Sequence, residues 1–515
     1  MQKTDALFRL IKGLNKNEKG YFKKFFSSGS KATNYMLLFD AIDKQQEYDE
    51  AAIMRKFRKE AFVKQLSVTK NYLFEQILKS QRAYHNQDML NAQLNNRLEN
   101  AEVLFTHALY GQSLDELQSA TEMALQYDQP LKLLEIKARE RALHLEIAAK
   151  DWDQQIGKNV EETRALIAQY SFYLDLFSIY YRLMYFWRHE RTIRTQEQKQ
   201  EFEMLMQSPV LKQHSKNSFY NEQLQLTIQM IYNFISNNDK ESFSYMKQIL
   251  DMWDKNPHMK KVEPVKYISA VNNYFNNCAK LERIDLIREY LTKFDNSIIE
   301  KNEAVEAIVF ETFSTYKTLI LFAENRFEEA SSLLEETRKG IKKFEGRINR
   351  VRLMLLRFNS LILYMVQNKF SEAIDMANEI LDEKDVDLRR DMQAATRIIY
   401  LMLHFELNNA VMLENAIRSS KRYLQTRDKY FETEKIFFRH FLQLNHSSDK
   451  QQRQKVCMEL RTELTALMEN DPLERNFLQT FNIFNWLNAK IEGISLQELL
   501  IQQSKAEQSQ LAKNN

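Results

Sequence analysis

Side chains able to do chemistry are sparse in this 515-residue chain and do not fall at catalytic spacings. Cys278 and Cys457 stand far apart in the sequence, and neither a CxxC nor an HExxH motif occurs. None of the nine histidines follows a glutamate by three residues, which excludes the Glu-x-x-His pairs of di-iron bundles. The eight scattered glycines assemble neither a phosphate-binding loop nor a dinucleotide fingerprint. We therefore expect no catalytic residue, no metal ligand and no cofactor.

A few single residues still need an interpretation. His404 lies in an apolar helical pattern, and Glu406, two positions on, faces another side of the helix. We expect His404 to be a hydrogen-bonded core or groove residue. Cys278 is expected to be a buried small residue and not a reactive thiol. His440 and His446 flank a predicted helix end, where a surface role near the terminal carbonyl groups is expected.

The composition predicts which elements position these residues. Only 8 glycines and 5 prolines occur, whereas a sheet protein of this length needs many more for its turns and bulges. The dominant residues, among them Leu, Lys, Glu, Gln and Ala, lose little side-chain freedom in a helix. The two cysteines do not make a disulfide scaffold, and no apolar run is long enough to span a membrane. An all-α, cytoplasmic protein is expected.

The first 85 residues form a predicted helical head with its own charge. They carry 17 Lys and Arg against 9 Asp and Glu, a net +8, so the remainder carries −5. Five helices are expected, the second preceded by a capping box of Asn15 and Glu18, the third over 32–44 and the fourth over about 49–59. The simpler interpretation of this head is a solvated bundle that caps the following helices.

A nucleic-acid interpretation of the head stays open beside it. Residues 48–84 could form a helix, a turn near Leu66 and Ser67, and a second helix beginning with Val68, as in a helix-turn-helix unit. The contacts would then come from five side chains: Lys64, Lys70, Asn71, Lys79 and Arg82. The turn lacks a glycine, and the basic residues are scattered, which favours the capping interpretation.

Beyond residue 86 the chain shows an internal spacing. Turn-like segments occur at 281–287, 324–330, 367–373 and 411–417, and their closing residues Ile287, Ala330, Ala373 and Ala416 stand 43 positions apart. Phe243 falls one step earlier, at an interval of 44. An aromatic residue also recurs every 42 positions, at Tyr232, Tyr274, Tyr316, Phe358 and Tyr400. Such spacing is typical of stacked helix pairs that bury one another's apolar faces.

The segments NRFEEA and NKFSEA resemble the start of the second helix in tetratricopeptide repeats, most clearly over residues 270–420. The units differ from that family in being 42–43 residues long and in lacking its turn glycine and its proline. The resemblance implies a right-handed α-solenoid of antiparallel helix pairs with a protein-interaction surface. The expected organisation is a basic helical head (1–85), a repeat array (86–500) and a polar, disordered tail (501–515).

Three functions are compatible with the sequence. The first is a non-enzymatic scaffold that binds a protein or peptide partner on the repeats, without membrane contact. The alternative is a transcriptional regulator with the head on DNA and the repeats as a sensor or dimerisation body. A weaker third possibility is an enzyme whose site is assembled across several repeats, which would require a deep pocket with perturbed titratable groups.

Overall fold

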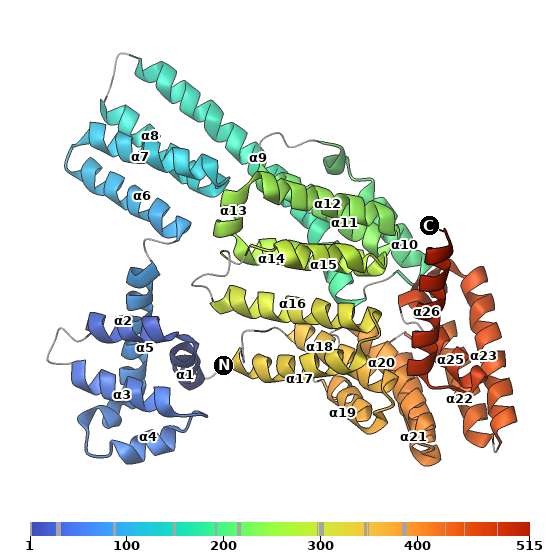
Figure 1. Cartoon of the computed structure of the whole chain (residues 1–515). Coiled ribbons are helices and arrows are strands. Elements are labelled where there is room, and N and C mark those ends of the chain that lie inside the picture. The colour runs from blue at the N-terminus through green and yellow to red at the C-terminus, as the bar shows by residue number, and fades with distance from the viewer. Residues whose placement is uncertain are drawn as a thin grey trace. The chain divides into compact units, whose positions relative to one another are not determined.

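The computed structural model describes most of the chain, with short interruptions between helices. The described residues are 3–26, 32–85, 89–147, 151–190, 193–213, 218–295, 297, 303–344, 348, 350–383, 389–427, 429–447, 449–480 and 483–514. Within these ranges the regular structure is entirely helical, so the all-α expectation is confirmed (Figure 1). None of the described helices has both the length and the apolar character needed to cross a lipid bilayer.

The chain divides into two compact units, 1–167 and 168–515. The helices of unit 1 are α1 (Lys3–Gly13), α2 (Lys16–Phe26), α3 (Ala32–Lys44), α4 (Glu50–Lys56), the short 3₁₀ helix η1 (Ala61–Gln65), α5 (Leu66–His85), α6 (Leu90–Thr106), α7 (Tyr110–Gln126) and α8 (Pro130–Ile147). The long helix α9 (Trp152–His189) begins in unit 1 and ends in unit 2.

The head follows the sequence pattern closely. Asn15 and Glu18 form the predicted capping box, since each accepts a hydrogen bond from the other's backbone N–H at 2.8–2.9 Å. Helices α1 to α5 enclose their own apolar core, to which Leu7, Phe22 and Ile77 belong. A separate core joins α6, α7 and α8. The boundary predicted after residue 85 therefore lies between two apolar cores of unit 1.

Unit 2 holds the remaining helices. They are α10 (Gln196–Met206), the 3₁₀ helix η2 (Pro209–Lys212), α11 (Phe219–Ile235), α12 (Asp239–Lys255), α13 (Pro257–Val262), α14 (Pro264–Lys280), α15 (Ile284–Lys293), α16 (Glu303–Ala323), α17 (Phe327–Lys343), α18 (Arg350–Val366), α19 (Phe370–Leu381), α20 (Arg390–Glu406), α21 (Ala410–Gln425), α22 (Glu432–His446), α23 (Lys450–Asn470), α24 (Pro472–Thr480), α25 (Phe484–Glu492) and α26 (Leu496–Asn514).

Consecutive helices of unit 2 pack against one another. Helix α11 packs on α12, α14 on α15, α16 on α17, α18 on α19 and α20 on α21, and each pair touches the next. Figure 1 shows these pairs as successive layers from α11 to α21. The order of contacts is compatible with a helical repeat. Helix α26 spans Leu496–Asn514 and so includes most of the predicted polar tail.

Seven turns between described helices share one geometry. In each, a single residue has a φ between 49° and 59°: Ala108, Asp128, Asn237, Glu282, Asn325, Asn368 and Asn408. The next residue donates its backbone N–H to the carbonyl five positions back, at 2.8–2.9 Å. This is the Schellman motif that ends many helices. Four of the seven residues are asparagine, which tolerates the left-handed conformation better than most residues and allows those turns to close without a glycine.

The turns also fix the true spacing of the helix pairs. Counted from each left-handed residue, the fifth position is buried in all seven cases: Ser113, Leu133, Ser242, Ile287, Ala330, Ala373 and Leu413. Three of the predicted closing residues, Ile287, Ala330 and Ala373, therefore occupy this fifth position. Ala416 is buried but lies one helical turn beyond Leu413, and Ser242 takes the place predicted for Phe243. The last interval, from Asn368 to Asn408, is 40 residues and not 43.

The aromatic spacing of 42 residues does not follow this register. Tyr232 precedes its left-handed residue by 5 positions, Tyr274 by 8, Tyr316 by 9, Phe358 by 10 and Tyr400 by 8. The 42-residue interval between the aromatic residues is constant, but the number of residues from each of them to the next turn is not. The aromatic side chains therefore lie at different distances from the C-terminal ends of their helices, and their spacing does not mark equivalent positions in the helix pairs.

Candidate functional site

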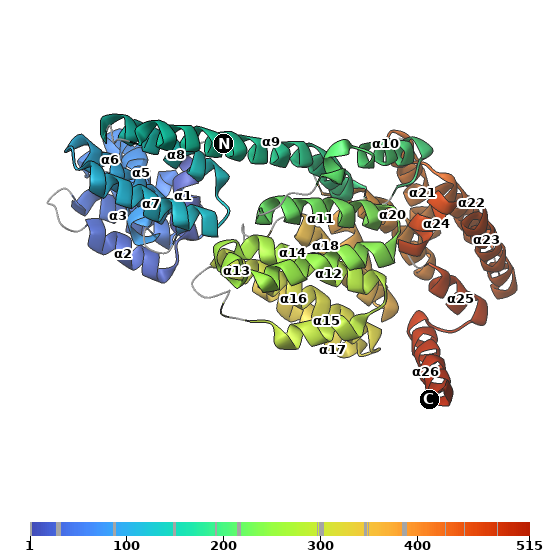
Figure 2. The ribbon, with the colours of Figure 1, turned by 90° about the horizontal axis from the view of Figure 1, so that it is seen from above.

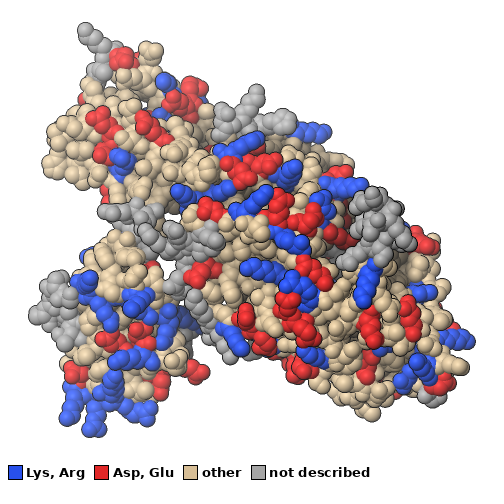
Figure 3. Space-filling view, in the orientation of Figure 1, with Lys and Arg blue, Asp and Glu red and all other residues tan. Residues whose placement is uncertain are grey.

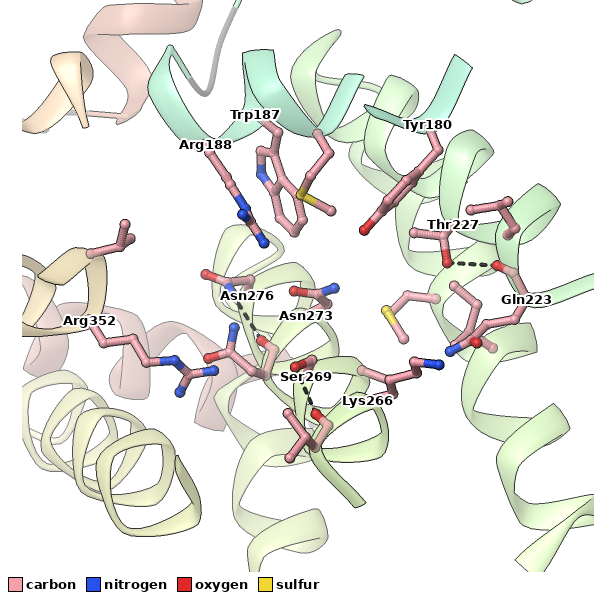
Figure 4. A pocket seen from close by; sticks show the side chains of 18 of the residues that line it. Tyr180, Trp187, Arg188, Gln223, Thr227, Lys266, Ser269, Asn273, Asn276 and Arg352 are labelled. Carbon is pink, nitrogen blue, oxygen red and sulfur yellow. Dashed lines mark hydrogen bonds between the residues drawn. The ribbon is translucent and has the colours of Figure 1, made fainter. Parts of the chain in front are cut away.

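A cavity of about 770 Å³ lies in unit 2 between the end of α9 and the helices that begin successive pairs. Helices α11 and α14 supply most of its floor, and α16 and α18 contribute residues at one side. Figure 4 shows side chains of α9 pointing toward those of α14 across the cavity. A cavity of this size is within the range of ligand pockets.

Carboxamide side chains line the α14 side of the cavity. The NNYFNN segment places Asn272, Asn273 and Asn276 on one side of α14, while Asn277 faces the core and accepts a hydrogen bond from Ser242 at 2.7 Å. Asn273 and Asn276 point into the cavity (Figure 4). The carboxamides of Asn272 and Asn273 form no hydrogen bond with any described residue. Each therefore presents a free donor and a free acceptor.

An aromatic wall from α9 faces these carboxamides. Tyr173 stacks on Phe177 with ring centroids 6.0 Å apart, and Phe177 lies 5.7 Å from Tyr180. Trp187 continues the wall toward α11, where its ring meets Phe234 edge to face. Burial raises the pKa of the Tyr180 hydroxyl above its ordinary value, so this group stays a neutral donor and acceptor at neutral pH. The cavity thus has one apolar side and one polar side.

The charges around the cavity are mostly positive. Arg188 on α9 is exposed and forms no ion pair with a described residue. Lys266 is paired with Glu263 at 2.9 Å and lies over the Tyr220 ring. Among the described residues that line the cavity, Glu311 is the one carboxylate, and it is buried and paired with Arg352.

The Glu311 carboxylate is held from several directions. Arg352 pairs with it and also donates to the Thr312 hydroxyl at 2.8 Å. Burial raises the pKa of Glu311, and the neighbouring guanidinium of Arg352 opposes that rise. The pair connects α16 to α18.

The residues predicted for nucleic-acid contact lie in the head. Lys64 is exposed on η1, and Asn71, Lys79 and Arg82 are exposed on α5. Lys70 is different, because its side chain is 6% exposed and its ammonium pairs with Glu50 and donates to the Tyr48 hydroxyl at 3.0 Å. The hydrogen bond from Lys70 also lowers the pKa of Glu50. A phosphate contact by Lys70 would require breaking this internal pair.

The helices around these residues differ slightly from the prediction. The chain turns at Phe57–Glu60, before η1, and α5 begins at Leu66; the turn predicted near Leu66 and Ser67 lies inside helical structure. The sequence interpretation also missed a run of exposed basic residues at this turn: Arg55, Lys56, Arg58 and Lys59. Figure 3 shows Lys and Arg gathered on the head. The sequence feature that could have revealed this basic turn is the presence of four basic residues within the five positions 55–59.

Three further candidates occupy buried positions. Cys278 is fully buried, and burial raises the pKa of its thiol to about 11, as expected for a core residue. His404 is also buried, but neither ring nitrogen has a hydrogen-bond partner among the described residues, so the predicted hydrogen bond is wrong. Its ring meets Tyr400 edge to face. His440 is buried rather than exposed, and its Nδ1 lies 3.0 Å from the Ile436 carbonyl.

The described residues bring together no three His, Cys, Asp or Glu side chains that could hold a metal ion. A comparison of the chain with protein-family models, with curated proteins and with solved structures finds no match in any of the three. Function is therefore inferred from the cavity and the head themselves.

Proposed function

We propose that this protein is a non-enzymatic interaction scaffold that binds an extended peptide segment of a partner protein in the cavity of unit 2. The proposed architecture is a right-handed array of tetratricopeptide-like helix pairs, elongated to about 40–45 residues each, with the cavity on its inner side. The single observation that carries the proposal is the pair of free carboxamides, Asn272 and Asn273, in a cavity that is also lined by the aromatic side chains of α9.

Chemistry supports a peptide as the ligand. An extended backbone offers N–H donors and carbonyl acceptors that no longer pair with each other, and a carboxamide can satisfy one of each. Tyr173, Phe177 and Tyr180 offer apolar contact area for a side chain of the same segment. The lining residues that the structure describes include no Cys, His or Asp, and their one Glu is held in a buried ion pair, which favours binding over acid–base chemistry.

The proposal is tested by selecting peptides from a random display library on the full chain. A selected peptide is then titrated by fluorescence polarisation against Asn273→Ala and the double variant Asn272→Ala/Asn273→Ala. We expect about tenfold weaker binding for each hydrogen-bonding carboxamide removed, since each is worth about 1 kcal/mol or slightly more. Asn415→Ala on α21 is the matched control, since Asn415 is outside the cavity. Equal affinity of all variants would refute the site.

A second candidate function rests on the exposed basic turn of the head. Arg55, Lys56, Arg58 and Lys59 form one run beside Lys64, and sequence-independent affinity for DNA is dominated by such phosphate contacts. The exposed face of α5 is less suited to phosphate binding, because the carboxylate of Glu75 lies between Asn71 and Lys79.

This candidate predicts binding to duplex DNA that weakens steeply with salt. Arg58→Gln/Lys59→Gln should lower the slope of log affinity against log salt by about 0.9 for each phosphate that the variant no longer neutralises. Lys247→Gln/Lys317→Gln, two exposed lysines of unit 2, is the charge-matched control and should change nothing. A head that binds no DNA at a salt concentration of about 50 mM would remove this candidate.

A further inference from the structure

Helix α9 is apolar on two opposite faces within unit 2. One face is buried and consists of Leu176, Ile179, Leu183 and Phe186. The opposite face consists of Tyr170, Leu174, Phe177, Tyr181 and Tyr185, and we name it the α9 stripe. At 3.6 residues per turn, each set spans an arc of about 80°, and their centres lie about 180° apart.

The stripe is open to solvent. Leu174 is 49% exposed, Phe177 41%, Tyr181 55% and Tyr185 60%, while Tyr170 is half-buried. Figure 2 shows this part of α9 along one edge of unit 2 beside α11, which the Trp187–Phe234 ring contact confirms. A helix of a globular protein normally has one apolar stripe and a polar opposite face, so a second, continuous stripe indicates a partner.

The spacing within the stripe indicates which partner. Tyr170 and Tyr185 are equally far from the midpoint between Phe177 and Ser178, and so are Leu174 and Tyr181. Apart from Phe177, whose mirror position is Ser178, these stripe residues therefore have the same spacing of 4, 7 and 4 positions when read in either direction. Two antiparallel copies centred on that midpoint would place Tyr170 against Tyr185 and Leu174 against Tyr181, twice, with the two Phe177 rings at the centre. Such a surface is self-complementary about a two-fold axis.

The charges beside the stripe agree with this arrangement. Asp175 and Arg182 lie on the same flank of α9, and in an antiparallel pair that flank faces the same flank of the second copy. Asp175 then lies within one turn of Arg182 in the second copy. Arg182 already pairs with Glu201 at 2.8 Å, so the approaching carboxylate would extend an existing ion pair.

We propose that two copies of this chain form a two-fold symmetric dimer by antiparallel pairing of their α9 stripes, centred between Phe177 and Ser178. The dimer does not depend on peptide binding, because the cavity and the stripe occupy different sides of α9 and share only Phe177. It leaves the α14 carboxamides free.

Light scattering after size-exclusion chromatography tests the association itself. The full chain should have twice the 61.6 kDa mass of one copy at micromolar concentration. Leu174→Glu/Tyr181→Glu places four carboxylates in the paired stripes and should give the single-copy mass. Met204→Glu, at a residue 67% exposed on α10, should remain dimeric. A wild-type chain of single-copy mass would overturn the proposal and leave the stripe to another protein.

Cysteine cross-linking tests the orientation with two matched serines. Ser171 and Ser178 are both exposed on the same edge of the stripe. In the antiparallel dimer the two copies of residue 178 are about 1.5 Å apart along the axis, and those of residue 171 about 20 Å. Ser178→Cys should therefore form an interchain disulfide under mild oxidation and Ser171→Cys should not. Cross-linking of both variants alike would overturn the arrangement. Native Cys278 and Cys457 are buried and do not interfere.

Discussion

At the scale of single residues, a buried cluster of three charges joins the start of unit 2 to its last helices. Arg194, whose side chain is 12% exposed, pairs with Glu434 at 2.8 Å and with Glu474 at 2.6 Å. Its guanidinium lies over the Phe431 ring, and Glu474 also accepts from the Thr433 hydroxyl at 2.7 Å. Both carboxylates raise the pKa of Arg194, which therefore stays charged although buried.

Removing the cation should destabilise unit 2 strongly. Arg194→Met leaves two buried carboxylates facing each other, and breaking a buried ion pair on one side costs about 3–5 kcal/mol. The loss is measured as a fall in the urea midpoint at neutral pH. Arg194→Met/Glu434→Gln/Glu474→Gln should recover part of the stability; no recovery would show that packing of Arg194, not its charge, matters.

The contacts of a single residue could be predicted from the sequence only where the residue it contacts lies nearby in the sequence. The Asn15–Glu18 capping box was predictable because both residues lie within four positions. The burial of Cys278 followed from the apolar pattern of one helix. The cluster around Arg194 had no such signal, since its partners lie 240 and 280 residues away. The burial of His440 was missed for the same reason: Glu463, 3.6 Å from its Nε2, comes from another helix.

At the scale of elements, the seven left-handed turns decide where each helix pair begins. Their position was only partly visible in the sequence, because asparagine, aspartate, alanine and glutamate all occur there instead of one marker residue. Matching alanines suggested a constant 43-residue interval, whereas the turn at Asn408 shortens the last interval to 40. A sequence interpretation that aligned Asn237, Asn325, Asn368 and Asn408 would have found the register.

Glu282 provides a test of this turn geometry. It is exposed, has a φ of 58°, and has a Cβ that the left-handed conformation disfavours by about 1–2 kcal/mol. Glu282→Gly should therefore raise the free energy of unfolding by about 1 kcal/mol. Glu282→Ala keeps the Cβ and should change it little, and Gln248→Gly, inside α12, should lower it by about 1 kcal/mol. Urea titrations distinguish the three, and destabilisation by Glu282→Gly would refute the geometry.

At the scale of the whole chain, the helical class and the five helices of the head were predictable from composition and periodicity. The unit boundary after Ile167 was not, because it falls inside the unbroken pattern of α9. The cavity was equally hidden. Asn272 and Asn273 belong to a polar run that looks solvated in sequence, and only the position of α9 opposite α14 makes them part of a site.

The Arg194 cluster has a consequence for the order of events during synthesis. Helix pairs that contact mainly their neighbours can form as they leave the ribosome. Arg194 can form its ion pair with Glu474 only after another 280 residues have been synthesised. At about 5–20 residues per second, the guanidinium stays hydrated for about 15–60 s while most of the array is already folded. Closure of this cluster is then a late step in the maturation of unit 2, and until it occurs a chaperone could still bind the open segment around Arg194.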